Sequence, residues 1–362
     1  MKRTYMNNVG GNLMQKCLVL AALLTTAGAA WAQSSVTIFG IVDTGLQYGT
    51  GSIGNKIRLA PNGNSASRLG FRGIEDLGGG MSAGFWLEAA VNGDDGTSPA
   101  SNTNNQVSGS VPAGSQGLTF MRRSTVSLLG GWGEVRLGRD LNPQVYNLLT
   151  LDPFGFVGAG ISLTSANAIT GVVKARSSNS ISYFLPAKLG GLYGQAMYYL
   201  GENNSGIPTE DDGTGAGLRV GYAAGPINLA IAVSRTQYAA GDISQNNIGG
   251  SYDFGRVKLM AQYGRDENGA ISARGYQVGG IVKAGAGEFK LGYSMYKTDA
   301  ARNPEARKVA VGYVHNLSKR TAVYATFARL KNKNGASFAL QGATTAPNTS
   351  SSGYDLGIRH TF

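Results

Sequence analysis

The last ten residues of the chain, 353–362, restrict the possible folds more than any other stretch. Successive side chains of a β-strand point to opposite faces, so alternate residues here form one apolar face and one polar face. The apolar face consists of Tyr354, Leu356, Ile358, His360 and Phe362. A terminal strand with a free edge invites aggregation, whereas a strand that closes a barrel has no free edge. Because about ten residues let a tilted strand cross a membrane, we expect this segment to close a transmembrane barrel.

The same alternation of apolar and polar residues continues along most of the chain after residue 34. Short glycine-rich turns alternate with long polar loops, and we count five candidate strands before residue 142 and eleven after residue 174. Beyond the N-terminus no apolar run reaches about 18 residues, so membrane-spanning helices are not expected. We therefore predict an all-β fold, an antiparallel transmembrane β-barrel of about sixteen strands with apolar residues facing lipid. A soluble β-sandwich is the alternative, but it would need far fewer strands.

Residues 1–32 have the organisation of a secretory signal peptide. They begin with basic residues, continue with an apolar core over 17–24 that is too short to span a membrane, and end in Ala-Trp-Ala. We expect cleavage after Ala32, which would remove the only cysteine, Cys17, and leave residues 33–362 as a single barrel domain.

The net charge of the chain is +11, of which three basic residues and no acid belong to the leader, so the mature chain carries +8. A basic balance is common among nucleic-acid-binding proteins, but no Lys/Arg-rich block or basic helical face occurs here. We therefore expect no nucleic-acid partner.

Residues 142–174 interrupt the alternation for more than thirty residues. The segment is too apolar for a solvated loop, with Leu148, Phe154 and Phe156 among its side chains. Long irregular segments in compact folds usually have a function. We expect this loop, over 141–175, to fold into the barrel and constrict its pore. An extracellular loop packed on its neighbours is the alternative.

Three segments resemble those of Gram-negative general diffusion porins. They are SVTIFG at 35–40, SRLGFRGIEDLGGG at 67–80 and GEVRLGR at 133–139. The sequence DPFG at 152–155 and the final RHTF also fit, and the resemblance is closest to the trimeric, anion-preferring porins of β-proteobacteria.

This resemblance implies a sixteen-stranded homotrimeric barrel in the outer membrane of a Gram-negative bacterium, with the third extracellular loop folded inward. It implies passive diffusion of ions and small hydrophilic solutes, anionic or neutral, through a water-filled channel. The implied partners are outer-membrane lipid with lipopolysaccharide and the barrel assembly machinery. Tyr354, Leu356, Ile358 and Phe362 would form the signal for barrel closure and assembly.

In porins of this kind, arginines on the barrel wall face acids on the inward loop. By motif position the wall residues here would be Arg68, Arg123 and Arg176, and the loop acid would be Asp152, the one acid in its segment. Arginine stays charged at physiological pH, and rings of Arg or Lys favour anions, so we expect a preference for anions. The alternative for each arginine is a rim position that meets lipopolysaccharide phosphates. That alternative has more weight for Arg122 and Arg139 than for the others.

Alternation also predicts secondary pore-lining residues. Arg72 shares the inner face of its strand with Arg68, and Glu88 and Asp43 are expected on the inner face of theirs. The two acids would either tune the flow of ions or pair with arginines.

Other activities have weaker support. A substrate-specific outer-membrane channel is the nearest alternative, and an adhesin or purely structural barrel is less favoured. A barrel enzyme needs an acid–base group beside a nucleophile, but His315 and His360 both lie at expected periplasmic strand ends. We therefore expect no catalytic residues and no cofactor. The acidic run Glu210–Asp212 could bind Ca²⁺ through carboxylate oxygens, although a solvated loop tip is favoured.

Overall fold

The computed structural model describes residues 35–109, 117–165, 169–170 and 175–362. The expected signal peptide at 1–32 lies outside these residues. The described part of the chain contains no helix that is both long enough and apolar enough to span a membrane.

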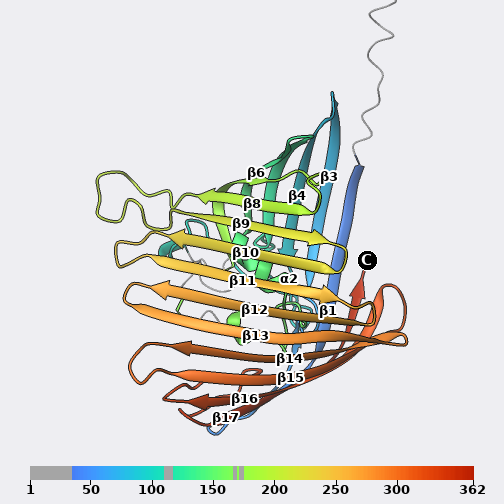
Figure 1. The fold of residues 1–362 in the computed structure, drawn as a ribbon, viewed down its shortest axis with the longest axis vertical. Helices are drawn as coiled ribbons and strands as arrows, with labels where there is room; N and C mark the ends of the chain where they lie inside the picture. Colours follow the sequence, from blue (N-terminus) through green and yellow to red (C-terminus); the bar gives the residue numbers. More distant parts are fainter. Residues whose placement is uncertain (1–34, 110–116, 166–168, 171–174) are drawn as a thin grey trace, which may run out of the picture.

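The described chain forms a single antiparallel sheet of seventeen strands that curves into a barrel (Figure 1). The strands are β1 (Ser35–Thr50), β2 (Lys56–Pro61), β3 (Arg68–Gly78), β4 (Met81–Ala90), β5 (Arg123–Gly130), β6 (Gly133–Leu141), β7 (Arg176–Phe184), β8 (Leu192–Tyr199), β9 (Gly215–Ala224), β10 (Ile227–Thr236), β11 (Ile243–Asp253), β12 (Val257–Asn268), β13 (Ile271–Ala284), β14 (Gly287–Thr298), β15 (Glu305–Asn316), β16 (Thr321–Lys333) and β17 (Ser350–Thr361).

Strand β1 closes the barrel because both of its edges are paired. One edge pairs with β17, and the other pairs with β3 along its first half and with β2 along its second half. The remaining strands pair in chain order from β3 to β17, so sixteen strands form the closed wall and β2 is an extra strand. The prediction of about sixteen strands is confirmed. The strand count from sequence did not include β2, which lies in the segment between β1 and β3.

The C-terminal strand completes the wall as its sequence predicts. After the last paired residue of β17, the backbone amide of Phe362 donates to the carbonyl of Gly40, and the Gly40 amide donates to the Phe362 carbonyl, both at 3.1 Å. The side chains of Tyr354, Leu356 and Phe362 are exposed, as expected for the lipid-facing side. Their role as an assembly signal stays a prediction.

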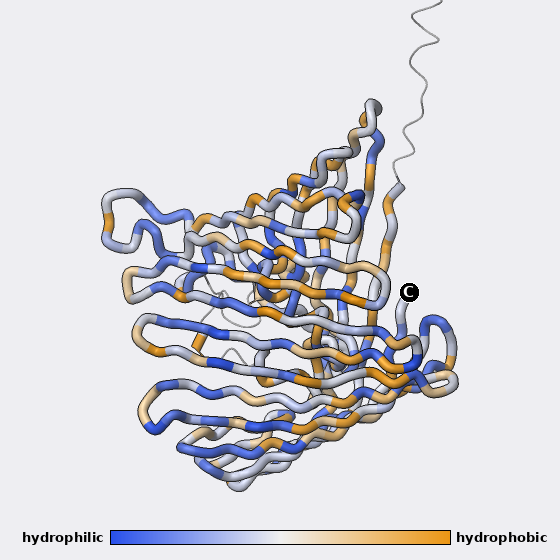
Figure 2. Tube along the Cα trace, in the orientation of Figure 1, coloured by the Kyte–Doolittle hydropathy of each residue, from blue (hydrophilic) through white to orange (hydrophobic). Residues whose placement is uncertain are grey.

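The two faces of the wall reverse the pattern of a soluble protein. Large apolar side chains point outward, for example Ile38 with 61% exposure and Leu229 with 55% exposure, whereas Gln262 and Gln277 point inward. Along several strands in Figure 2, hydrophobic and hydrophilic residues alternate as this arrangement requires. Polar side chains therefore line the lumen and apolar ones form the outer surface.

The turns at one end of the barrel are short. Between β3 and β4 the three glycines Gly78, Gly79 and Gly80 all have positive φ values, of 78°, 62° and 80°. Other residues rarely adopt this left-handed conformation, so glycine makes the turn possible. Most of the longer loops lie at the opposite end (Figure 1).

The loop between β6 and β7 folds into the lumen, as predicted. Its helix α2 (Pro143–Thr150) begins with a proline in the first turn, where a missing amide donor is harmless. Figure 1 shows α2 inside the barrel, and its amide side chains bind inward amides of β11: Gln144 Nε2 donates to Gln245 at 3.1 Å, and Asn147 Nδ2 donates to Asn247 at 2.9 Å. A short 3-10 helix, η1 (Val107–Gly109), lies in an earlier loop.

The second half of the same loop is held by the opposite wall. The backbone amide of Leu163, in the 3-10 helix η2 (Leu163–Ser165), donates to Ser294 Oγ at 3.0 Å. Lys308 Nζ donates to the carbonyls of Ala159 and Ile161, and Phe154 packs in a buried cluster with inward residues of β14, β15 and β16. The loop is therefore fixed to the wall at both of its ends and along its middle.

Candidate pore constriction

A cavity of about 520 Å³ lies in the lumen beside the inward loop. It is bounded by the wall of β3–β7, by the loop and by the far wall of β12–β14. Its charged lining residues are Arg68, Arg122, Arg123, Arg176, Lys290, Glu88, Asp140 and Asp152. The structure thus brings Arg68, Arg123, Arg176, Asp152 and Glu88, all predicted from sequence, into one cavity.

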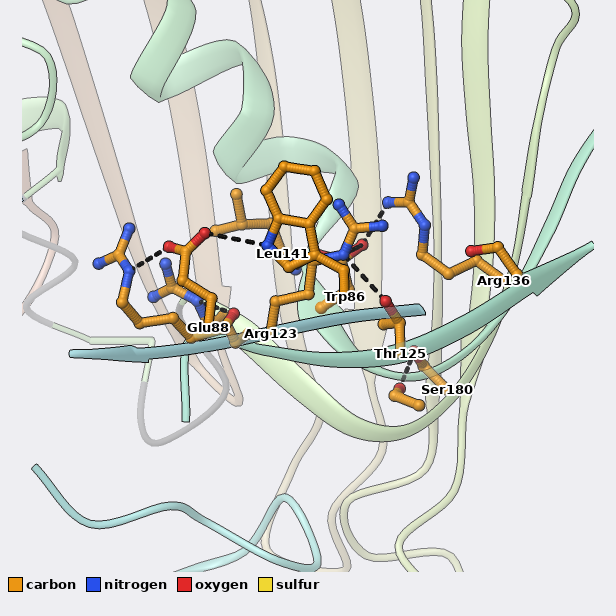
Figure 3. Close-up of polar contacts among 12 residues, drawn as sticks. Trp86, Glu88, Arg123, Thr125, Arg136, Leu141 and Ser180 are labelled. Carbon is orange, nitrogen blue, oxygen red and sulfur yellow. Dashed lines mark hydrogen bonds and ion pairs between the residues drawn. The ribbon is translucent and has the colours of Figure 1, made fainter. Parts of the chain in front are cut away.

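Glu88 on β4 is the centre of one charge cluster. Arg122 Nε donates to its Oε1 at 2.5 Å, Arg68 Nη1 lies 3.5 Å from the same oxygen, and Trp86 Nε1 donates to Oε2 at 3.2 Å. Figure 3 shows the hydrogen bond between the Trp86 ring nitrogen and Glu88 as a dashed line. Two arginines therefore share one carboxylate, and this cluster keeps a net positive charge.

Arg123 on β5 lies on the other side of Trp86. Its guanidinium carbon is 4.5 Å from the centre of the Trp86 ring, and its Nε donates to Thr125 Oγ1 at 2.9 Å (Figure 3). Its distance to Asp140 Oδ2 is 3.9 Å, whereas Arg136 Nη1 approaches the same oxygen to 2.5 Å. Arg136 also binds Glu134, at 2.8 and 3.0 Å, so Arg136 and Arg123 together face the two acids Asp140 and Glu134, and stacking on the ring orients Arg123.

Arg176 on β7 and Arg139 on β6 are held by neutral groups. Arg176 Nε donates to the carbonyl of Arg122 at 2.7 Å. Arg139 donates to the carbonyl of Met121 at 2.6 Å and to Ser178 Oγ at 2.8 Å. Arg122 and Arg139 therefore bind within the barrel wall, and the rim position considered for them from sequence was wrong.

Asp152 lines the cavity but is only 4% exposed. Its carboxylate accepts hydrogen bonds from the backbone amides of Phe154 and Ser162, each at 2.9 Å. Burial raises the pKa of Asp152, and these amide donors together with nearby Lys308 oppose the rise. Within the described structure the carboxylate therefore organises the loop and presents little charge to the lumen.

The secondary pore-lining candidates divide into two environments. Arg72 stacks over Phe39 and Trp86, at 5.4 and 5.1 Å from their ring centres, in a second cavity nearer the short turns. Asp43 is fully buried, where it accepts hydrogen bonds from the amides of Gly63, Asn64 and Ser65 and from the hydroxyl of Tyr324. Asp43 thus fixes the segment between β2 and β3.

Sequence reasoning missed two cations of the cavity, Arg122 and Lys290. Arg122 precedes β5, where strand alternation no longer assigns a face. Lys290 lies across the barrel on β14, where its Nζ donates to Asn64 Oδ1 at 3.0 Å. Alternation with the outward Leu291 places Lys290 on the inner face, but sequence alone does not reveal which wall it opposes.

Two acids of the run at 210–212 accept backbone hydrogen bonds, one from the same loop and one from the loop between β10 and β11. Glu210 accepts from the amide of Gly206 at 2.7 Å, and Asp212 accepts from the amide of Ala239 at 2.6 Å. In the described ranges, no three His, Cys, Asp or Glu side chains gather closely enough to hold a metal ion.

Comparisons with known proteins agree with this geometry. The sequence profile described as "Gram-negative porin" matches residues 19–335. Outer membrane porin protein 32 of Delftia acidovorans is 38% identical, over 96% of this chain and 100% of its own length. The solved structure of an anion-selective porin from Comamonas acidovorans is 36% identical with a TM-score of 0.80, covering 91% of this chain and 100% of that one.

A more distant structure shares only the fold. The trimer form of OmpT from Vibrio cholerae is 15% identical, with a TM-score of 0.64 over 91% of this chain and 99% of that one. The closed barrel, the inward loop and the close relatives together lead to one assignment. The chain belongs to the Gram-negative porin family and is an outer-membrane channel for passive diffusion, not an enzyme.

Proposed function

We propose that this porin prefers anions, and that Arg68, Arg123 and Arg176 face the inward loop with Asp152 to form its constriction. The observation that supports the proposal most is the charge of the cavity lining, which has five cationic and three acidic side chains. In this proposal the loop over 141–175 determines the width of the pore.

The acids of the cavity carry little uncompensated charge toward the lumen. Glu88 is shared by two arginines, Asp140 has Arg136 as its close partner, and Asp152 is buried among backbone donors. Arg176 forms no ion pair in the described part of the chain, so its charge is the least compensated, and a positive potential lowers the barrier for anions. The name of the Comamonas relative describes that porin as anion-selective.

Reversal potentials across a planar bilayer with a KCl gradient test this proposal. The purified porin is expected to give a reversal potential whose sign shows that chloride permeates more easily than potassium. The preference should be larger at low ionic strength, because screening is weaker there. A potential of the opposite sign, or none, would refute the anion preference while leaving the membership of the family intact.

We further propose cleavage of the leader after Ala32, assembly into a homotrimer, and contacts with the barrel assembly machinery and with lipopolysaccharide. The trimer form of OmpT, which shares the fold, supports the oligomeric state. N-terminal sequencing of the exported protein should begin at Gln33. Light scattering in detergent should give three chains per particle. If the protein were a conducting monomer, the proposed trimer would be contradicted but the channel function would not.

A further inference from the structure

The tip of the inward loop rests on a part of the barrel wall whose inward side chains are small. Phe154 of the loop is only 4% exposed, and two glycines border its ring, Gly292 on β14 and Gly312 on β15. The chain neighbours of these glycines, Leu291 and Val311, are 47% and 42% exposed on the outer surface. Because successive residues of a strand point to opposite faces, both glycines face the lumen.

The backbone of the wall does not require glycine at either position. Gly292 and Gly312 lie in the interior of long strands, and neither has a positive φ. Glycine in the interior of a strand weakens a sheet, and it often marks a place where another part of the chain approaches closely. The segment that approaches here is the inward loop, so the loop explains these two glycines better than the wall does.

A Cβ atom at either position would meet the ring of Phe154. At Gly292 this atom would lie 3.2 Å from Cε2, and among the described residues the ring is its sole neighbour within 4 Å. At Gly312 it would lie 3.1 Å from Cε1 and 3.0 Å from Thr326 Oγ1. Carbon atoms in ordinary contact are about 3.5–4.0 Å apart, so the ring would have to retreat by about 0.5 Å. The two contacts are at opposite edges of the ring, so a tilt would relieve one and tighten the other.

A retreat of the ring would carry the loop tip with it. The backbone amide of Phe154 donates to the carboxylate of Asp152 at 2.9 Å, and the same carboxylate accepts from the amide of Ser162 at 2.9 Å. Asp152 and Pro153 line the cavity whose other side is the arginine wall. A movement of the tip away from β14 and β15 is therefore a movement into the lumen.

We propose that Gly292 and Gly312 are positioning residues that set the width of the pore. Because they have no side chains, Phe154 packs directly on the wall and the loop stays back from the arginines opposite. The inference rests on the proposed role of the loop as the constriction. It adds that the wall behind the loop also determines which solutes are small enough to pass, and it is independent of the anion preference.

The test compares the double variant Gly292→Ala/Gly312→Ala with the matched control Gly264→Ala. Gly264 faces the lumen on β12 between the buried Gln262 and Asp266, and a Cβ atom there would meet its two nearest neighbours at 3.7 and 3.8 Å, which are ordinary contacts. The full-length porin is inserted in planar bilayers. Single-channel conductance and the largest poly(ethylene glycol) that enters the pore are measured.

Two further variants separate the possible causes of a change. Adding Phe154→Leu to the double variant removes the ε carbons that the new methyl groups would meet, so it should restore the wild-type pore. Leu149→Trp adds bulk on the lumen side of α2, where Leu149 lines the cavity and is 38% exposed. It should narrow the pore whatever occupies the glycine positions.

We expect the double variant to lose about a tenth of the conductance, because a retreat of about 0.5 Å narrows an opening about two water molecules wide by about that fraction. It should also exclude smaller polymers than the wild type does, whereas Gly264→Ala should behave like the wild type. If the double variant does not insert, each single alanine variant should show about half of the loss.

An unchanged or wider pore in the double variant would overturn the inference, and so would wild-type behaviour of both single variants. An equal loss in Gly264→Ala, or a variant with Phe154→Leu that stays as narrow as the double variant, would also overturn it. A pore that Leu149→Trp leaves unchanged would instead contradict the proposed role of the loop as the constriction.

Discussion

Arg123→Gln isolates the contribution of one lumen charge. The variant should fold, because Asp140 keeps Arg136 as its partner at 2.5 Å and glutamine can still reach Thr125. The guanidinium of Arg123 lines the cavity between wall and loop, so an ion in transit passes close to it. Its removal should therefore weaken the preference for anions without closing the pore.

The size of the effect follows from Coulomb's law. A unit charge about 6 Å from an ion in water contributes about 0.7 kcal/mol, which screening at 0.1 M salt reduces to about 0.4 kcal/mol. That energy changes the entry of an anion about twofold and the entry of a cation about twofold in the opposite direction. The chloride-to-potassium permeability ratio should thus fall about fourfold at 0.1 M and about sevenfold at 0.01 M.

The assay is the reversal potential of single porins in a KCl gradient at these two salt concentrations. Arg235→Gln is the matched control, because it removes the same charge from an exposed side chain that pairs with Asp242 outside the lumen. A permeability ratio that stays at the wild-type value in Arg123→Gln, or that falls equally in the control, would refute the assignment of Arg123 to the constriction.

Three further substitutions test other parts of the account. Glu88→Gln should raise the chloride-to-potassium permeability ratio about fourfold at 0.1 M salt, because it removes a negative charge from the lumen. A reversal potential that shifts toward cation preference would contradict this. Lys308→Met removes donors to two loop carbonyls and should give larger, noisier single-channel conductance, and recordings as quiet as wild type would argue against loop anchoring. Ile231→Arg places a charge on the outward face at the middle of β10 and should lower the unfolding free energy in lipid vesicles by about 2–4 kcal/mol; an unchanged urea midpoint would show that Ile231 does not face lipid.

The strands of the barrel wall could be predicted from sequence because their apolar and polar residues alternate with a period of two. The side chain of Leu356 points outward and that of its neighbour Asp355 points inward. A shift of the strand register by one residue would turn the apolar face toward the water-filled lumen. Strand β2 escaped prediction because its six residues lie within a Gly- and Asn-rich stretch and pair with only part of β1.

The site was predicted only in part, because alternation gives the direction of a side chain and not its partners. Asp43 and Asp152 do lie on the inner side, but backbone amides from segments distant in sequence or within the loop cover their carboxylates. Lys290 joins the cavity only because the barrel closes and brings β14 opposite β3. Contacts of this kind depend on three-dimensional closure, which no local pattern encodes.

The central claim is that ions pass through a water-filled lumen beside the cationic cavity while apolar side chains face lipid. The most direct test uses single cysteines at Lys290 and at its chain neighbour Leu291, in a chain whose one native cysteine, Cys17, lies in the proposed leader. A water-soluble, negatively charged thiol reagent is added to porins conducting in a planar bilayer. We predict that Lys290→Cys loses conductance and anion preference on modification, whereas Leu291→Cys does not respond. Equal responses at the two positions, or a response at Leu291→Cys alone, would contradict the account.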